Sequence, residues 1–203
     1  MVLIGLVGIN RVGKDTLAEI LTKEYKFKQY ALADPIKKVA KILFDFDDAQ
    51  LSGCKKEEID PRWNISPRQF YQSFGTEIMQ YGIYKYLPHL IEKVPERFFW
   101  VVKMENWVDQ QRKIGNINIV ISDIRFVHEA SSIRRLGGVL LQITRNNAEY
   151  CMTDVKTDGT YIHSSQTQIN DIPSEWIDYH IKNDTNLEEY IKEINNIIPA
   201  III

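Results

Sequence analysis

Residues 2–16 read VLIGLVGINRVGKDT, and this stretch decides the fold. The apolar, β-branched run from Val2 to Val7 predicts a short buried strand, and helix-forming residues follow Thr16. Between them lies a loop framed by Gly8 and Gly13, with the spacing G-x-x-x-x-G-K. A buried strand, this loop and a helix start are together typical of a phosphate-binding loop.

The chemistry of the loop supports that interpretation. Glycines let the backbone turn its N–H groups inward around phosphate oxygens, and a helix that opens at Lys14 adds the positive end of its dipole. Lys14 adds a point charge for the β- and γ-phosphates of a nucleotide. We therefore predict a nucleotide site that comprises Gly8, Asn10, Arg11, Val12, Gly13, Lys14, Asp15 and Thr16.

Asp15 departs from the usual form of this loop. The loop normally ends Gly-Lys-Ser/Thr, and that hydroxyl ligates Mg²⁺. Here a carboxylate stands in its place, which can reach the metal directly or through a water but also competes with the charge of the triphosphate. We expect Asp15 to be a metal ligand of this kind, and the Gly-Lys-Asp form is similar to that of small-metabolite kinases.

Length and charge limit the class of protein. At 203 residues with a net charge of −2, the chain suits one α/β domain and offers no polybasic surface for nucleic acid or membranes. Its two cysteines are widely separated and lack metal-ligand spacing, as expected of a protein in a reducing cytoplasm. The phosphates of a small ligand must therefore be met by local cations.

Strand and helix patterns alternate along the chain, which predicts a mostly parallel sheet with helices on both faces. Further strands are expected at Phe27–Leu32, Asn118–Asp123, Val139–Thr144 and Trp176–Ile181. Helices are expected after the loop, from Asp34-Pro35, from Ser66-Pro67, over Phe99–Lys113, over Ile124–Leu136 and from Leu187.

Two groups of polar residues mark candidate ligand sites. Asp123 ends a buried strand, and ligands of open α/β sheets lie just beyond such strand ends. Arg68, Gln72 and Gly75 fall at i, i+4 and i+7 on one side of a helix. That side is polar and contains a glycine, which suits a ligand better than a core.

Several separated stretches together resemble the deoxynucleoside monophosphate kinases of bacteriophages and large viruses, which are P-loop kinases. The matching pieces are residues 8–16, 33–37, 68 with 72 and 74–77, 100–101, 122–125 with 128–130, 137–138 and 183–184. The resemblance implies a P-loop NTPase-type three-layer fold that transfers the γ-phosphoryl of ATP, with Mg²⁺, to a deoxynucleoside monophosphate. It places the protein in the cytoplasm, of the host if it is viral, and leaves a homodimer open.

The resemblance also divides the single domain of residues 1–203 into parts. The core would comprise about 1–44 and 117–203, an acceptor-binding helical insertion about 45–116, and a lid about 146–170. In the lid, Gln166 stands where this family usually has glutamate. The acceptor residues that it implies are Lys37, Arg68, Gln72, Gly75, Thr76, Asp123, Arg125 and Glu129.

Roles within this set follow from the demands of phosphoryl transfer, which are positioning and positive charge. Lys14, Asp15, Arg11 and Arg125 are the expected catalytic group, and Asp15 with Asp123 is the expected metal pair. Arg145 is a candidate for stacking on adenine.

Ordinary structural roles compete with these functions. Arg11 can be a plain surface-loop arginine, and Lys37 a solvated lysine. Arg125 and Glu129, at i and i+4, can be a helix salt bridge.

Two alternative functions remain at this point. A phosphomevalonate kinase of the animal type carries a related Gly-Lys-Asp loop and would use the same chemistry. A regulatory module that binds a nucleotide without catalysis belongs to another class. The Asn-Lys-x-Asp and Asp-x-x-Gly motifs of a GTPase do not occur in the chain.

Overall fold

The computed structural model describes residues 1–115, 117–146 and 168–202. These residues form two compact units, which we call the sheet unit (Met1–Ala31 with Trp107–Ile203) and the helical unit (Leu32–Asn106). The helical unit contains residues 45–106, where an insertion was expected, and also residues 32–44. None of the helices in the described ranges is long and apolar enough to cross a bilayer.

The sheet unit is built on five strands in the order β2-β3-β1-β4-β5, and every pairing between neighbours is parallel. The strands are β1 (Leu3–Val7), β2 (Lys28–Tyr30), β3 (Ile119–Ile124), β4 (Val139–Thr144) and β5 (Tyr179–Lys182). The central strand, β1, is buried along its whole length, as expected of a strand covered on both faces. The predicted parallel sheet is confirmed.

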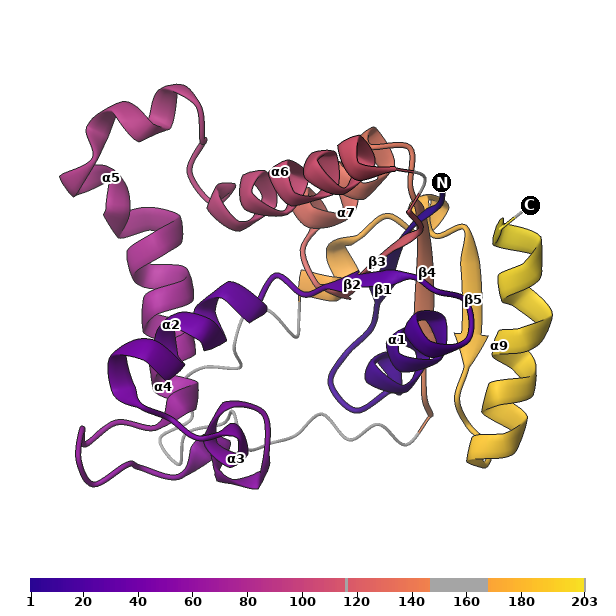
Figure 1. The fold of residues 1–203 in the computed structure, drawn as a ribbon, viewed down its shortest axis with the longest axis horizontal. Coiled ribbons are helices and arrows are strands. Elements are labelled where there is room, and N and C mark those ends of the chain that lie inside the picture. The colour runs from indigo at the N-terminus through magenta and orange to yellow at the C-terminus, as the bar shows by residue number, and fades with distance from the viewer. Residues whose placement is uncertain (116, 147–167, 203) are drawn as a thin grey trace. The chain divides into compact units, whose positions relative to one another are not determined.

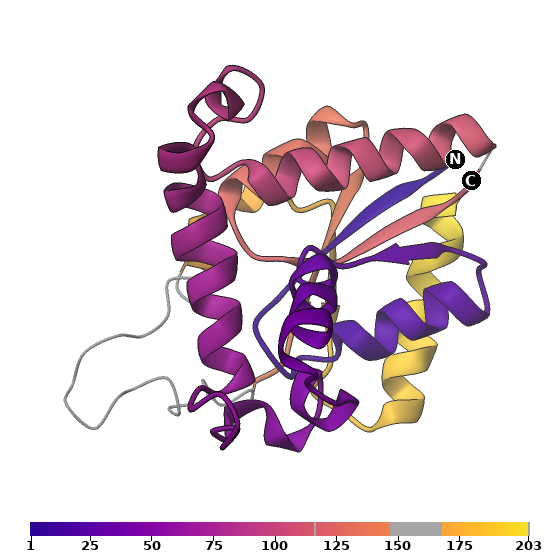
Figure 2. The same ribbon diagram turned by 60° about the vertical axis from the view of Figure 1, so that its left-hand side comes forward.

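Helices cover both faces of this sheet, as predicted (Figures 1 and 2). The helices α1 (Lys14–Lys23) and α9 (Leu187–Ile202) share one apolar cluster with β1, β4 and β5. Helix α7 (Val127–Arg135) packs on the opposite face, where a Cβ atom at Gly5 would lie 3.1 Å from Ile133 Cγ1. Gly5 thus allows a close approach between the central strand and α7.

The helical unit has its own small core, formed by Ala40, Phe46, Leu51 and Phe70. Its α-helices are α2 (Asp34–Phe44), α3 (Asp48–Leu51), α4 (Pro67–Gln72) and α5 (Ile83–Tyr86), and α6 (Phe99–Ile114) begins in it. A π-helix, Ser73–Gly82, connects α4 to α5. Such helices are rare and wind more widely than an α-helix.

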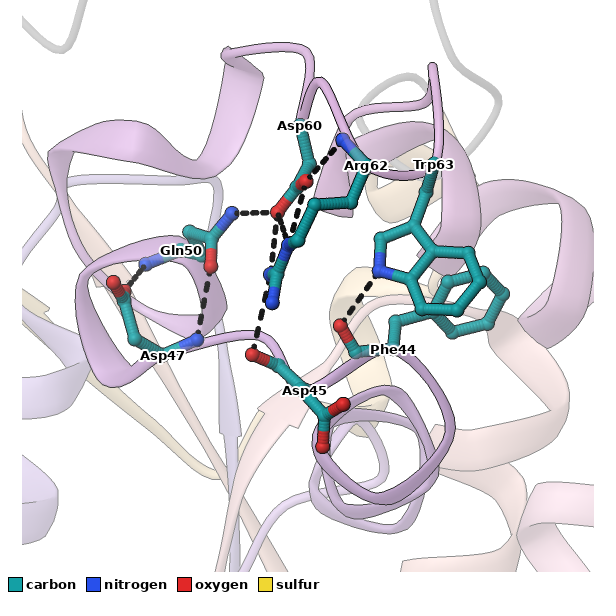
Figure 3. Close-up of polar contacts among 7 residues, drawn as sticks. All are labelled: Phe44, Asp45, Asp47, Gln50, Asp60, Arg62 and Trp63. Atoms are coloured by element: carbon teal, nitrogen blue, oxygen red, sulfur yellow. Dashed lines mark hydrogen bonds and ion pairs between the residues drawn. The ribbon is translucent and has the colours of Figure 1, made fainter.

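A polar network centred on Asp60 orders the chain between α2 and α4 (Figure 3). The buried carboxylate of Asp60 accepts hydrogen bonds from Arg62 Nη2 at 2.7 Å and from Gln50 Nε2 at 2.8 Å. These hydrogen bonds hold the pKa of Asp60 below its ordinary value, Arg62 contributing most. The indole of Trp63 donates to the carbonyl oxygen of Phe44 at 2.9 Å. Residues 45–65, the first part of the expected insertion, are therefore held by specific contacts.

Several predicted boundaries were wrong. The last strand begins at Tyr179, because Ser174–Trp176 forms a 3-10 turn. Helix α7 begins at Val127, because β3 continues through Ile124.

Two helices have ends that need a separate description. Asp34 is the first residue of α2, and the N-cap is Ala33, which makes no side-chain hydrogen bond. Leu43, near the end of the same helix, is 58% exposed. Helix α9 continues through Ile202, and Ile201 and Ile202 pack against the core of the sheet unit.

Candidate active site

The loop between β1 and α1 has the backbone that its two glycines predict. Gly13 has a φ of 106°, a left-handed conformation that favours glycine, and α1 begins at the next residue. At Gly8 a Cβ atom would lie 2.8 Å from the carbonyl oxygen of Ile143. Larger residues at these positions would therefore distort the loop.

Lys14, the first residue of α1, is buried against the loop. Its Nζ donates to the carbonyl oxygens of Gly8 at 2.7 Å and Ile9 at 2.5 Å. The pKa of Lys14 is lowered from its ordinary value to about 8, mainly by burial and then by the positive charge of Arg125. The charges of Asp15 and Asp123 oppose that shift, so both carboxylates are near enough to interact with Lys14.

The carboxyl end of β3 brings a second cation to the loop. Strand β3 pairs with β1, with Val7 opposite Ile124, so the residues that follow both strands lie at one edge of the sheet. Arg125 Nη2 donates to Asn10 Oδ1 at 3.0 Å. The structure therefore brings together six of the predicted residues, which are Gly13, Lys14, Asn10, Asp15, Asp123 and Arg125.

Glu129 lies in the first turn of α7 and caps its start. Its Oε2 accepts hydrogen bonds from the backbone N–H groups of Arg125 at 2.8 Å and Phe126 at 3.1 Å. The residue is 5% exposed, and burial raises its pKa from the ordinary 4.5 to about 8. These contacts make Glu129 a cap of α7 that shapes the turn bearing Arg125, whereas the substrate contact stays a prediction.

Two side chains from the other end of the chain hold the loop from outside, and the sequence did not single them out for this role. Asn183 Nδ2 donates to the carbonyl oxygen of Val12 at 2.9 Å. The hydroxyl of Tyr190 donates to the carbonyl oxygen of Gly13 at 3.1 Å. The signal available in the sequence was a tyrosine at an apolar position of a helix, because the hydroxyl of a buried tyrosine usually has a hydrogen-bond partner.

In the helical unit, Arg68 already has a partner. Its Nε lies 2.9 Å from Glu57 Oε1, in an ion pair whose side chains are 26% and 55% exposed. Gln72 follows on the same helix, α4, and is half-buried, as are Lys37 on α2 and Thr76 in the π-helix.

Gly75 does not share an open polar face with Arg68 and Gln72. It is buried, a Cβ atom there would lie 2.8 Å from Ile36 Cδ1, and its carbonyl oxygen accepts a hydrogen bond from Trp100 Nε1 at 2.8 Å. The predicted face assumed α-helical winding, whereas the wider π-helical winding begins at Ser73. Gly75 is therefore a packing position within the helical unit.

The remaining predicted positions are more peripheral. Arg11 is exposed in the loop, with a φ of 64°, and Arg145 is exposed directly after β4. Most of the expected lid at 146–170, including Gln166, lies outside the described residues.

The donor atoms near Lys14 suit Mg²⁺ bound together with a nucleotide. Within the described ranges, no three His, Cys, Asp or Glu side chains are grouped so as to hold a metal by themselves. Mg²⁺ commonly takes one or two carboxylates, with phosphate oxygens and waters as its other ligands. Asp15 and Asp123, which both interact with Lys14, match that donor set.

Comparison with known proteins places this geometry in a family. The family model for deoxynucleotide monophosphate kinases matches residues 2–59 and 46–194. A curated protein of Acanthamoeba polyphaga mimivirus, named "Putative deoxynucleotide monophosphate kinase", is 33% identical over 96% of this chain and 94% of its own. A sugar kinase from Janibacter sp. HTCC2649 has the same fold, with 14% identity, a TM-score of 0.50 and coverage of 99% and 98% of the two chains. The chain belongs to the deoxynucleotide monophosphate kinase family and is a nucleotide kinase.

Proposed function

We propose that the protein transfers the γ-phosphoryl group of ATP to a deoxynucleoside monophosphate, giving the deoxynucleoside diphosphate and ADP. An oxygen of the acceptor phosphate forms a bond to the γ-phosphorus, and the bond from that phosphorus to the bridging oxygen breaks, leaving with ADP. The observation that carries the proposal is the cluster of Lys14, Arg125, Asp15 and Asp123 at the loop of a chain in this family.

The donor site would be the loop itself. Its backbone N–H groups and the start of α1 hold phosphate oxygens, and Lys14 exchanges its carbonyl partners for the β- and γ-phosphates. Gly8, Asn10, Arg11, Val12, Gly13 and Thr16 complete this ATP site, with Arg145 against the adenine. Arg11 adds a cation at the exposed mouth of the loop.

Arg125, the second cation, would stabilise the negative charge that shifts during phosphoryl transfer. Arg125 is held against the loop through Asn10, so its guanidinium is positioned before substrates bind. Preorganised positive charge of this kind stabilises a transferring phosphoryl group without reorganisation at the moment of reaction. We assign Arg125 to the catalytic group together with Lys14.

Asp15 and Asp123 would hold Mg²⁺ directly or through water. The ion would supply neutralisation of the negative charge on the triphosphate. The charge of Asp123 also favours the protonated form of Lys14.

The helical unit would supply the acceptor site. A guanidinium matches a phosphate in bidentate fashion, so Arg68 is the proposed phosphate ligand and must release Glu57 to bind it. Gln72 lies one turn along α4 and can meet a base edge. Lys37 and Thr76 are the further proposed acceptor residues in this unit.

A coupled assay of ADP release tests the proposal. The enzyme is supplied with ATP, Mg²⁺ and each deoxynucleoside or ribonucleoside monophosphate in turn, with mevalonate 5-phosphate in parallel. We expect turnover with at least one deoxynucleoside monophosphate and none for Lys14→Ala. Turnover with mevalonate 5-phosphate alone would refute the proposed acceptor.

A further inference from the structure

We propose that Asn183 and Tyr190 are positioning residues that fix the phosphate-binding amides of the loop from its outer side. The inference rests on the proposed function and extends it to residues of the last strand–helix turn. It is carried by two hydrogen bonds that end on consecutive carbonyl groups of the loop.

Asn183 follows β5 and is 8% exposed. Its own backbone N–H donates to the carbonyl oxygen of Thr144 at 2.8 Å, so the residue is fixed to the sheet. Its side-chain amide donates to the carbonyl oxygen of Val12 at 2.9 Å. A Cβ atom on Gly13 would lie 2.5 Å from the Asn183 Nδ2 atom, so the fit also requires glycine there.

Tyr190 lies in α9 and is 1% exposed. Its ring packs in the apolar cluster between α9 and the sheet, while its hydroxyl reaches the carbonyl oxygen of Gly13 at 3.1 Å. Burial raises the pKa of Tyr190, which keeps the hydroxyl protonated and therefore a donor.

Because of peptide geometry, these two hydrogen bonds also fix the directions of two backbone N–H groups. A trans peptide is planar, with its C=O and N–H pointing in opposite directions. The Val12 carbonyl shares a peptide with the N–H of Gly13, and the Gly13 carbonyl shares one with the N–H of Lys14. Holding both carbonyls toward Asn183 and Tyr190 therefore turns both N–H groups away from them, toward the side of the loop available to phosphate.

The hydroxyl of Tyr190, and not its ring, carries the proposed positioning role. Tyr190 belongs to an apolar cluster that would bury a phenylalanine equally well, yet its hydroxyl is hydrogen-bonded to the loop. Gly13 O also accepts the first hydrogen bond of α1, from Leu17 N at 3.1 Å, so the phenol is a second donor to an oxygen that is already bonded. Positioning and packing are therefore separated by whether the loss of this hydroxyl changes phosphate binding.

Tripolyphosphate binding, measured by calorimetry, tests the inference without catalysis or an acceptor. Tyr190→Phe removes only the hydroxyl, and Asn183→Leu removes the amide donor at similar size. Because each neutral hydrogen bond contributes modestly, we expect each variant to bind tripolyphosphate and ATP about three- to tenfold more weakly. The KM for the monophosphate should stay within about twofold, since neither residue is proposed to contact the acceptor.

Tyr25→Phe is the matched control. The Tyr25 hydroxyl donates to Asn195 Oδ1 of α9 at 2.9 Å, so this variant removes a tyrosine bond to the same helix without touching the loop. We expect wild-type affinity for tripolyphosphate in this control. If Tyr190→Phe does not fold, Asn183→Leu decides.

The outcomes separate the two proposals. If the wild type binds tripolyphosphate and both variants bind it equally well, the positioning role is wrong and the proposed function still stands. A wild-type protein that fails to bind either tripolyphosphate or ATP would overturn the proposed donor site, and this inference with it.

Discussion

Arg125 donates a hydrogen bond from Nη2 to Oδ1 of Asn10 across 3.0 Å, which ties the turn after β3 to the phosphate loop. The two residues are 115 positions apart in the chain. The contact places a guanidinium next to Lys14, whose pKa it lowers, so two cations share this edge of the sheet. Two adjacent cations repel each other, and a polyanion that binds between them relieves that repulsion.

Arg125→Lys should reduce catalysis more than binding. Lysine keeps the charge but loses the planar fork and its contact with Asn10, so the charge is no longer held in one place. We expect kcat to fall by about tenfold to a hundredfold, with both KM values within about threefold. Steady-state kinetics measure this.

Arg134→Lys on α7 is the control for that change, because Arg134 pairs with Asp178 at 3.0 Å instead of with the loop. It should retain wild-type kinetics. If Arg125→Lys raises only the KM of the monophosphate, Arg125 is an acceptor ligand and not part of the transfer machinery.

ATP binding should weaken at alkaline pH because of Lys14. Without nucleotide its pKa is lowered to about 8, and bound phosphate must raise that value because it favours the charged form. Between the two pKa values, ATP binding takes up a proton, so the affinity should fall as pH rises above about 8, by up to tenfold per pH unit.

Calorimetric titration of ATP binding from pH 7 to pH 10 tests this slope. Lys14→Arg stays charged over this range and should show a flatter profile, whereas equal slopes would assign the effect to another group.

Asp15→Asn tests the metal role of the unusual loop residue. The amide keeps the size of the side chain but is a poorer ligand for Mg²⁺, so kcat should fall more than the affinity for ATP. Activity of both proteins should be lost in EDTA. Glu19→Gln, an exposed acidic residue of α1 that pairs with Lys23, is the control and should be neutral. Loss of ATP affinity alone would make Asp15 a binding residue.

The sheet and the loop were predictable because their signals are local. The run of Val2 to Val7 is apolar enough to specify a buried strand, and Gly13 before Lys14 specifies where α1 begins. Val139–Thr144 was predicted with the bounds that the structure has, since Gly137 ends the preceding helix in a left-handed conformation with a φ of 75°. In each case, a few adjacent residues determine the backbone.

The long-range contacts that hold the site in place were not predictable in this way. Periodicity places Tyr190 in the core, but it does not reveal that its hydroxyl reaches Gly13, 177 positions earlier in the chain. The π-helix from Ser73 changes which residues share a face, and this removed Gly75 from the predicted polar side. Both depend on tertiary contacts that no short stretch encodes.

The ion pair between Arg68 and Glu57 predicts different effects on the KM of the monophosphate when each of its two members is replaced. Arg68→Lys should raise the KM of the monophosphate by about tenfold to a hundredfold, because a charge-assisted, bidentate contact contributes about 1.5 to 3 kcal/mol. Glu57→Gln frees the guanidinium from a competing carboxylate, so the same KM should fall or stay unchanged. The KM of ATP should remain within about twofold in both variants. An increase of the acceptor KM in Glu57→Gln would mean that Glu57 holds Arg68 in its binding position.

Glu129→Gln should make the protein more stable at alkaline pH. The folded-state pKa of Glu129 is raised from 4.5 to about 8 by burial, so between these values the native state holds a proton that the unfolded state has lost. Stability must therefore fall as pH rises through this window. Glutamine has no proton to lose, and its side-chain oxygen can still accept from the N–H groups of Arg125 and Phe126.

Urea unfolding at pH 5 and pH 8 should show a loss of stability in the wild type that is smaller in Glu129→Gln. Glu188→Gln, in the exposed first turn of α9, tests whether any such change near a helix start has this effect. An equal loss in wild type and Glu129→Gln would show that the Glu129 carboxyl is ionised in the folded protein throughout, and that its two backbone hydrogen bonds outweigh its burial.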